Sequence, residues 1–128
     1  MYPKDFRYTE DHEWIKVEGE TGTVGITDHA QKQLGDIVFV EVPEVDEEVS
    51  AGDEAGSIES VKAVADVFSP VSGTIVEVNE SLEDAPETVN QDPHGDGWLF
   101  KVEMSDSSEL DDMMDAAAYE KFLEEEEG

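Results

Sequence analysis

The sequence predicts one mainly β domain with a short internal helix and a helical tail. Three features support this: a length of 128 residues, short apolar runs that alternate with polar residues, and Gly or Pro between those runs. A chain of this length can enclose one hydrophobic core but hardly two. Alternation with a period of two is typical of strands that bury one face. We therefore expect residues 1–128 to form a single domain.

The first two strands are predicted between His12 and Ile26, where apolar residues alternate on both sides of a turn marked by Gly19 and Gly22. Later strands are short and closely spaced, with Pro and Gly turns between them. They are expected at Ile37–Val40, Ser57–Val61, Val67–Ser69, Thr74–Val78 and Trp98–Val102.

Two segments have helical features. Thr27 is a suitable N-cap for a short helix over residues 28–34, and Gly35 can end that helix in the left-handed conformation. The tail over residues 107–125 has apolar residues at helical spacing, after a possible cap at Ser107 or Ser108. The apolar positions of this predicted amphipathic helix are Leu110, Met113, Met114, Ala117, Ala118 and Phe122.

The charge of the chain excludes several functions. Seven Lys and Arg against 35 Asp and Glu give a net charge of −28, yet an apolar fraction of 38% is ordinary for a folded domain. Nucleic acids and anionic membranes are excluded as partners, because both are bound through Lys and Arg. Like charges at this density repel one another unless salt screens them. We therefore expect a halophilic protein in a high-salt cytoplasm.

Other residue types narrow the chemistry further. The chain has no Cys, so a disulfide framework, a thiolate metal site and a cysteine nucleophile are excluded. Its three histidines, His12, His29 and His94, lie on separate segments without metal-binding spacing, and we assign no metal site. No apolar run has the roughly 18 residues needed to span a bilayer, and no signal peptide is evident. A soluble cytoplasmic monomer is expected.

Lys62 is one of only six lysines and lies in a short segment between two predicted strands. From spacing alone, it is most simply interpreted as a solvated lysine at a hairpin turn. Its neighbourhood indicates more. Residues 56–63 (GSIESVKA) with residues 69–73 (SPVSG) closely resemble the lipoyl-lysine region of glycine cleavage H proteins.

Further motifs of that family follow in the same order along the chain. The resemblance covers almost the whole sequence, including the tail. The additional motifs are residues 12–14 (HEW), 25–30 (GITDHA), 34–36 (LGD) and 96–98 (DGW).

The resemblance implies a barrel-sandwich hybrid of two small antiparallel sheets, with lipoic acid attached to Lys62 through an amide. It also implies a non-catalytic shuttle of the glycine cleavage system. Such a carrier takes an aminomethyl group from the pyridoxal-phosphate-dependent glycine decarboxylase to the tetrahydrofolate-dependent aminomethyltransferase. Dihydrolipoyl dehydrogenase then reoxidises the arm, and a lipoate-attaching enzyme modifies the lysine.

The family also suggests roles for acidic residues. Glu13 and Asp66 match positions suited to holding the protonated amine of the loaded arm in a cleft, whereas the simplest interpretation of each is a solvated acid among 35. Glu59 and Ser60 are candidates for recognition by the attaching enzyme. His12 and Glu13 could form an acid–base pair, but adjacent residues on a strand point to opposite faces, which argues against it. Asp11 departs from the small hydroxyl residue that is common in the family at this position.

Three alternatives share the exposed lysine. A biotinyl carrier is expected to have Met on both sides of the lysine, whereas this chain has Val61 and Ala63. A lipoyl domain of a 2-oxoacid dehydrogenase usually belongs to a longer chain, without a helical tail. An H-like platform for lipoate transfer to other enzymes has the same motifs, and the sequence leaves it open.

Overall fold

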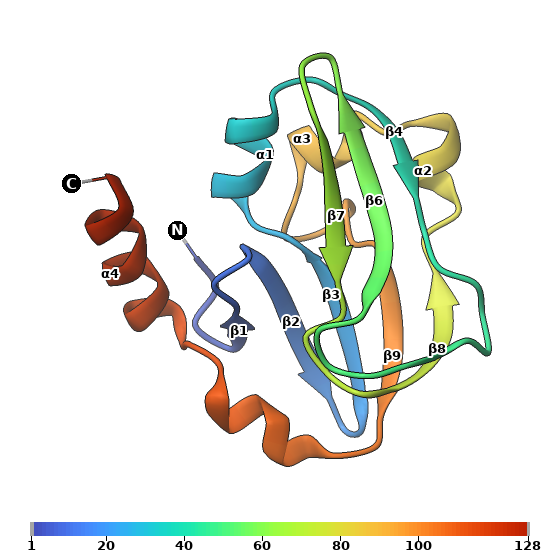
Figure 1. The fold of residues 1–128 in the computed structure, drawn as a ribbon, viewed down its shortest axis with the longest axis vertical. Helices are drawn as coiled ribbons and strands as arrows, with labels where there is room; N and C mark the ends of the chain where they lie inside the picture. The colour runs from blue at the N-terminus through green and yellow to red at the C-terminus, as the bar shows by residue number, and fades with distance from the viewer. Residues whose placement is uncertain (1, 128) are drawn as a thin grey trace.

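The computed structural model describes residues 2–127, with Glu127 described by its backbone alone. Within this range the chain forms two antiparallel sheets that face each other (Figure 1). The larger sheet has the order β1-β2-β3-β9-β8-β5, and its strands are Phe6–Tyr8, Glu13–Glu18, Thr21–Ile26, Phe100–Met104, Gly73–Val78 and Glu48–Val49. The smaller sheet has the order β4-β6-β7, with strands Ile37–Glu41, Glu54–Ser60 and Val64–Phe68.

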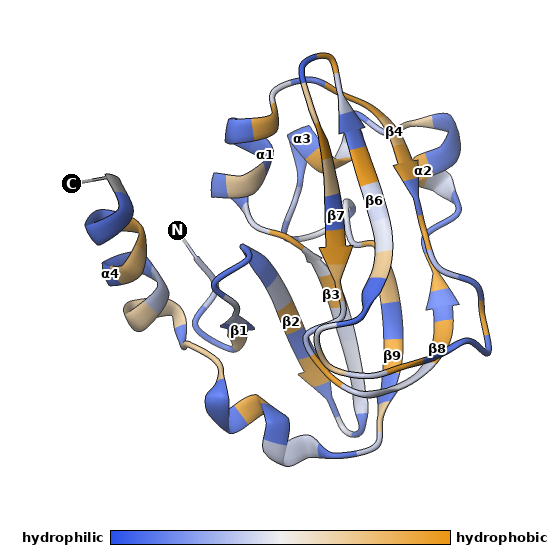
Figure 2. Ribbon diagram, in the orientation of Figure 1, coloured by the Kyte–Doolittle hydropathy of each residue, from blue (hydrophilic) through white to orange (hydrophobic). Residues whose placement is uncertain are grey.

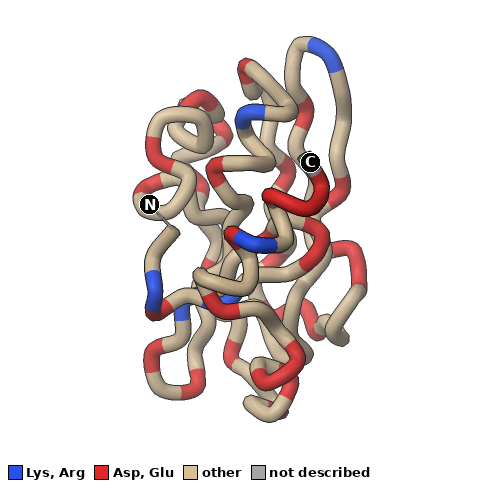
Figure 3. The backbone as a smooth tube through the Cα atoms, turned by 90° about the vertical axis from the view of Figure 1, so that its left-hand side faces the viewer, with Lys and Arg blue, Asp and Glu red and all other residues tan. Residues whose placement is uncertain are grey.

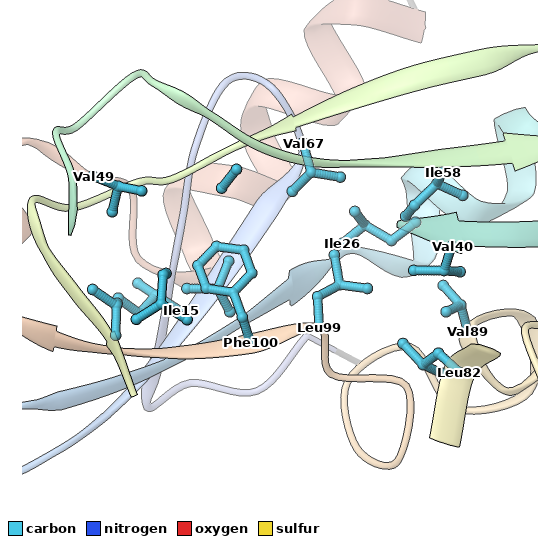
Figure 4. Packing of buried hydrophobic residues seen from close by; sticks show 14 of the residues in the cluster. Ile15, Ile26, Val40, Val49, Ile58, Val67, Leu82, Val89, Leu99 and Phe100 are labelled. Carbon is cyan, nitrogen blue, oxygen red and sulfur yellow. The ribbon is translucent and has the colours of Figure 1, made fainter. Parts of the chain in front are cut away.

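The main hydrophobic core lies between the two sheets (Figure 4). Ile15, Ile75 and Phe100 enter it from the larger sheet, and Val40 and Ile58 enter from the smaller one. All five side chains are at most 2% exposed. Each contributes about 1.5–3 kcal/mol through removal of apolar surface from water. Apolar and hydrophilic residues are mixed along most strands, whereas residues 37–40 of β4 are all apolar (Figure 2). The predicted mainly β fold with two small sheets is confirmed.

The predicted hairpin between His12 and Ile26 and the helix after it are confirmed, although an unpredicted strand, β1, precedes them. Strands β2 and β3 form a hairpin whose turn contains Gly19 at φ 65°, whereas Gly22 lies inside β3. Helix α1 spans Asp28–Leu34, and the Thr27 hydroxyl accepts a hydrogen bond from the Ala30 amide at 3.2 Å. Gly35 ends the helix at φ 80°, and its N–H donates to the Gln31 carbonyl. The capping residues thus act as the sequence indicates.

The segment between β8 and β9 differs from expectation. It contains two short helices, α2 (Ser81–Asp84) and α3 (Thr88–Gln91), which the sequence analysis did not predict. Each buries one apolar side chain, Leu82 or Val89, against the main core. The last strand begins at Phe100 rather than Trp98, because the Asn79 side-chain amide donates to the Trp98 carbonyl.

The predicted helix over residues 107–125 is wrong as one continuous element. The tail forms a 3₁₀ helix, η1 (Ser107–Asp112), and a separate helix, α4 (Ala116–Glu127). Between them, Met114 exchanges two backbone hydrogen bonds with Tyr8, at 2.8 and 3.0 Å, and this pairing interrupts the helix. Asp106, not Ser107 or Ser108, caps η1 by accepting from the Ser108 amide.

The apolar stripe of the tail is shifted accordingly. Ala117 and Ala118 are exposed, and the buried residues of α4 are Ala116, Tyr119 and Leu123. These pack in a second cluster with aromatic residues of the N-terminal segment, which the sequence analysis missed: Tyr2, Phe6, Tyr8 and Trp14. None of the helices within residues 2–127 combines the length and apolar character required to span a membrane.

Candidate functional site

Lys62 lies at the tip of the hairpin formed by β6 and β7, which projects beyond the two sheets (Figure 1). Its side chain is exposed, as are those of both neighbours, Val61 and Ala63. The two strands pair from Glu54 and Phe68 up to Glu59 and Val64, with one register shift between Glu54 and Gly56 and regular pairing from there to the tip. A paired hairpin of this length gives the lysine a fixed root while leaving its amine accessible.

Ser60 builds the turn that presents Lys62. Its hydroxyl donates to the Ala63 carbonyl at 3.2 Å and accepts from the amides of Lys62 and Ala63 at 3.3 and 3.1 Å. The side chain is only 6% exposed. Sequence analysis assigned Ser60, with Glu59, to enzyme recognition. The geometry gives Ser60 a positioning role in the turn, whereas Glu59 is exposed beside it and available for contact.

The turn rests against the end of helix α1. The Val61 amide donates to the Asp36 carbonyl at 3.0 Å. A Cβ added at Gly35 would lie 3.5 Å from Cε of Lys62, so the lysine stem crosses directly over this glycine. Because 3.5 Å is an ordinary van der Waals contact, the positive φ at the helix end is the feature that favours glycine here.

A cleft of about 200 Å³ opens beside this helix, below the hairpin tip. We call it the Glu13 cleft. Both ionisable and apolar side chains line it. Its lining residues are Asp11, His12, Glu13, Ile26, Ala30, Gln33, Leu34, Ile58, Ala65, Asp66 and Val67. The structure thus brings together Glu13 and Asp66, which are far apart in the sequence.

Glu13 is buried in the wall of this cleft, with 2% of its surface exposed. Its carboxylate accepts from the Phe68 amide at 3.0 Å and from the Thr9 hydroxyl at 3.1 Å. Burial raises the pKa of Glu13 to about 7, although these two hydrogen bonds favour the charged form. Because Glu13 is on β2 and Phe68 is on β7, the carboxylate also connects the two sheets.

Asp66 lines the same cleft as Glu13 but differs from it in burial. It is exposed on β7, opposite Ser57 of β6. Its negative charge raises the pKa of the nearby Glu54 carboxyl. The cleft therefore has one buried acid, Glu13, that is partly protonated near neutral pH, and two exposed acids, Asp11 and Asp66.

His12 corrects one inference from the sequence. Opposite faces were expected for His12 and Glu13, but β2 begins at Glu13 and His12 precedes it in the left-handed region, at φ 67°. Both side chains consequently border the same cleft. The Nδ1 atom of His12 lies 2.8 Å from the Tyr119 hydroxyl of α4.

The partners of Glu13 were missed by sequence reasoning. Thr9 precedes Glu13 by four residues, and its hydroxyl also accepts from the Glu13 amide at 3.2 Å. Because Thr9 is so close to Glu13 in the sequence, this hydrogen-bond partner could have been predicted. The Phe68 amide could not, because it lies 55 residues away and carries no side-chain signature.

Acidic residues are distributed over the whole molecule, whereas basic ones occupy few positions (Figure 3). Some lysines are paired with them, as in Lys32–Asp28 at 2.9 Å and Lys101–Glu77 at 3.9 Å. Seven basic side chains cannot neutralise 35 acids. A cationic ligand in the Glu13 cleft therefore meets a favourable field from the entire chain.

Comparisons with known proteins agree with the geometry. The glycine cleavage H-protein family model matches residues 6–126. The chain is 57% identical over 126 residues to the glycine cleavage system H protein of Carboxydothermus hydrogenoformans, covering 98% of this chain and 97% of the relative. It is also 57% identical over 120 residues to that of Thermotoga maritima, covering 94% and 97%.

A solved structure supports the same assignment. The crystal structure of a glycine cleavage system H protein from Mycobacterium marinum matches with a TM-score of 0.88 and 43% sequence identity. The match covers 95% of this chain and 98% of that one. From its sequence, its fold and its exposed hairpin lysine, the chain belongs to the glycine cleavage H-protein family.

Proposed function

We propose that Lys62 carries lipoic acid through an amide at Nζ, and that the chain is the non-catalytic shuttle of the glycine cleavage system. The observation that carries this proposal is the placement of Lys62. Its amine is exposed at the tip of a paired hairpin, and an acid-lined cleft lies beside the same hairpin. An attachment lysine needs this combination of a fixed root, free access and a nearby resting place.

The residues around Lys62 fit a lipoyl group. The lysine stem passes Gly35 at van der Waals distance, and the preceding residue, Leu34 at the end of α1, lines the cleft. Asp66 lies four residues along the hairpin from Lys62, about 13 Å at the rise of a β-strand. A lysine lengthened by a lipoyl group spans that distance. The apolar side of the cleft, including Ala30 and Leu34, suits its hydrocarbon chain.

A bound lipoyl group supplies a disulfide–dithiol couple that can carry an aminomethyl unit. The chain's own acids then act on the amine of that cargo. A protonated amine in the Glu13 cleft favours the ionised form of Glu13, and the resulting charge-assisted hydrogen bond holds the amine away from bulk water. Asp66 assists at the opening, where its charge is solvated.

The hairpin tip also has features suited to docking enzymes. Val61 and Val64 on either side of Lys62 are 69% and 68% exposed, an unusual degree for apolar side chains. The partners that we propose are glycine decarboxylase, aminomethyltransferase, dihydrolipoyl dehydrogenase and a lipoate-attaching enzyme. Exposed Val61, Val64 and Glu59 offer contacts that all of them can reach without entering the protein core.

Substitution of Lys62 by Arg tests the proposal in a reconstituted system with all partner enzymes and free lipoate. Arg keeps the positive charge but cannot form the lipoyl amide, so glycine cleavage and synthesis should both fall to background. Lys121→Arg is the matched control, because Lys121 is also exposed but lies on α4. Unimpaired turnover with the Lys62→Arg protein would refute the attachment site.

A further inference from the structure

Two histidines that are separated in the sequence meet beside the C-terminal helix. The ring centroids of His12 and His29 are 4.7 Å apart. His12 precedes β2, and His29 lies in the first turn of α1. The carboxylate of Glu126, on the last turns of α4, approaches the same place. One donor atom from each of these three residues lies within 4.8 Å of the other two.

We propose that His12, His29 and Glu126 form a binding site for a divalent transition-metal ion, with Zn²⁺ as the ion that fits these ligands best. Imidazole nitrogen and carboxylate oxygen are both common zinc ligands, and three protein ligands leave a fourth position for water. The proposal is independent of Lys62 and of any lipoyl group.

The geometry of the best-defined pair agrees with this. Nε2 of His12 and Oε2 of Glu126 are 3.3 Å apart. In a tetrahedral site with metal–ligand distances near 2.0–2.1 Å, adjacent donor atoms are separated by about 3.3–3.4 Å. The three donor atoms lie within 4.8 Å of one another, so they must draw closer together to reach this spacing. Glu126 has 42% of its side chain exposed, so it can move to accommodate this change.

His12 is oriented for ligation by groups behind it. Its Nδ1 lies 2.8 Å from the Tyr119 hydroxyl, which in turn lies 2.7 Å from the Thr27 hydroxyl. With Nδ1 donating to Tyr119, the Nε2 lone pair points toward Glu126. Such a hydrogen bond to the second ring nitrogen is the usual support of a metal-binding histidine.

A metal ion at this site also offsets an unfavourable charge arrangement at the C-terminal end of α4. This helix ends in residues 124–127, four consecutive glutamates, at the end where the helix dipole favours positive charge. A divalent ion on Glu126 supplies that charge and links the last turns of α4 to β2 and α1. The simpler alternative is that the 3.3 Å contact is only a hydrogen bond between His12 and Glu126.

Zinc titration of the full-length, metal-free protein distinguishes the two interpretations. Isothermal titration in high KCl with excess Mg²⁺ suppresses diffuse binding to the surface acids. Wild-type protein should bind one Zn²⁺ per chain, and Co²⁺ should give the absorption bands of a tetrahedral ion. Zinc should also raise the thermal midpoint.

Glu126→Gln should weaken zinc binding at least tenfold and remove the thermal shift, whereas Glu125→Gln, its exposed neighbour, should change neither. His12→Asn and His29→Asn should weaken binding further, with His94→Asn as the control. Asn tolerates the left-handed backbone of His12. Should a histidine variant fail to fold, the pair of glutamate variants still decides. Equal binding by the Glu126 and Glu125 variants, or no single-site binding by wild type, would overturn the proposal.

Discussion

The two ends of the proposed arm path differ sharply. At one end, Lys62 stands exposed on a hairpin tip between two exposed apolar residues. At the other, Glu13 is almost fully buried, and burial raises its pKa to about 7. The first environment leaves an ordinary amine accessible to enzymes. The second changes the chemistry of an ordinary carboxyl.

This difference indicates how a small carrier divides its tasks. Attachment and delivery require access, which a narrow hairpin stiffened by Ser60 provides. Retention of a cationic cargo requires an anion with little surrounding water, where the attraction between charges is stronger. The experiments below alter one end at a time.

At the buried end, the expected effect is on the lifetime of the loaded arm. Glu13→Gln combined with Asp66→Asn should shorten the lifetime of the loaded arm about tenfold, which corresponds to about 1.4 kcal/mol, without altering lipoylation. The loss follows from removal of two of the three acids that line the cleft. Release of the one-carbon cargo from purified, loaded protein without partner enzymes measures that lifetime.

Glu103→Gln combined with Asp111→Asn is the control. It removes the same number of charges from exposed positions outside the cleft. A wild-type lifetime in the cleft variant, or an equal loss in the control, would show that the cleft does not hold the amine.

The pKa of Glu13 predicts a pH effect on stability. Its folded-state pKa of about 7 exceeds the ordinary value of 4.5, so the folded protein binds the extra proton. The stabilisation that comes from this proton is fully present below pH 4.5 and is lost as the pH rises through about 7. The contribution is on the order of 3 kcal/mol. The free energy of unfolding, measured with urea from pH 4 to 8, should decline less steeply for Glu13→Gln than for wild type. Parallel pH dependences of the two proteins would contradict the raised pKa of Glu13.

A smaller effect is expected at the exposed end. Ser60→Ala should lower the free energy of unfolding by about 1–2 kcal/mol, because the turn loses the hydroxyl that satisfies two amides. The looser turn should also slow lipoylation of Lys62. Ser57→Ala is the control, because Ser57 lies on the same strand and its hydroxyl donates only a long hydrogen bond, of 3.4 Å, to the Glu41 carboxylate. Equal lipoylation rates for both variants would argue against a positioning role.

Salt should have the smallest effect on the difference between the Lys62 end and the Glu13 end, although it acts on the whole molecule. At a net charge of −28, the thermal midpoint should rise steeply as KCl or NaCl first screens the surface acids. Screening alone should level off near 1 M, where the Debye length is about 3 Å. The stability difference between wild type and Glu13→Gln should stay nearly constant, because Glu13 is buried. A midpoint that is flat across this range would rule out a high-salt adaptation.

Sequence signals that extend over a few residues predicted much of the fold and the position of the attachment lysine. Alternating apolar residues located β2 and β3, and Thr27 with Gly35 located helix α1 to the residue. Lys62 was found because flanking motifs surround it. In each case the determining contacts lie within a few positions along the chain, so the sequence itself contains the cause.

Features that depend on distant contacts could not be predicted in this way. Pairing of Met114 with Tyr8 divides the helical tail, and no residue near Met114 signals it. The environment of Glu13 depends on the remote Phe68 amide. The meeting of His12 and His29 depends on a left-handed backbone at His12, where the alternation of a strand had been assumed.

The identity of the group on Lys62 is the central claim, and intact mass spectrometry of protein purified from its own host tests it most directly. Peptide mapping assigns the modified residue. We predict a mass increment of one lipoyl amide, confined to the peptide that contains Lys62, with the other five lysines unmodified. An unmodified Lys62 in a host that lipoylates its other carrier proteins, or a lipoyl group on another lysine, would contradict the account.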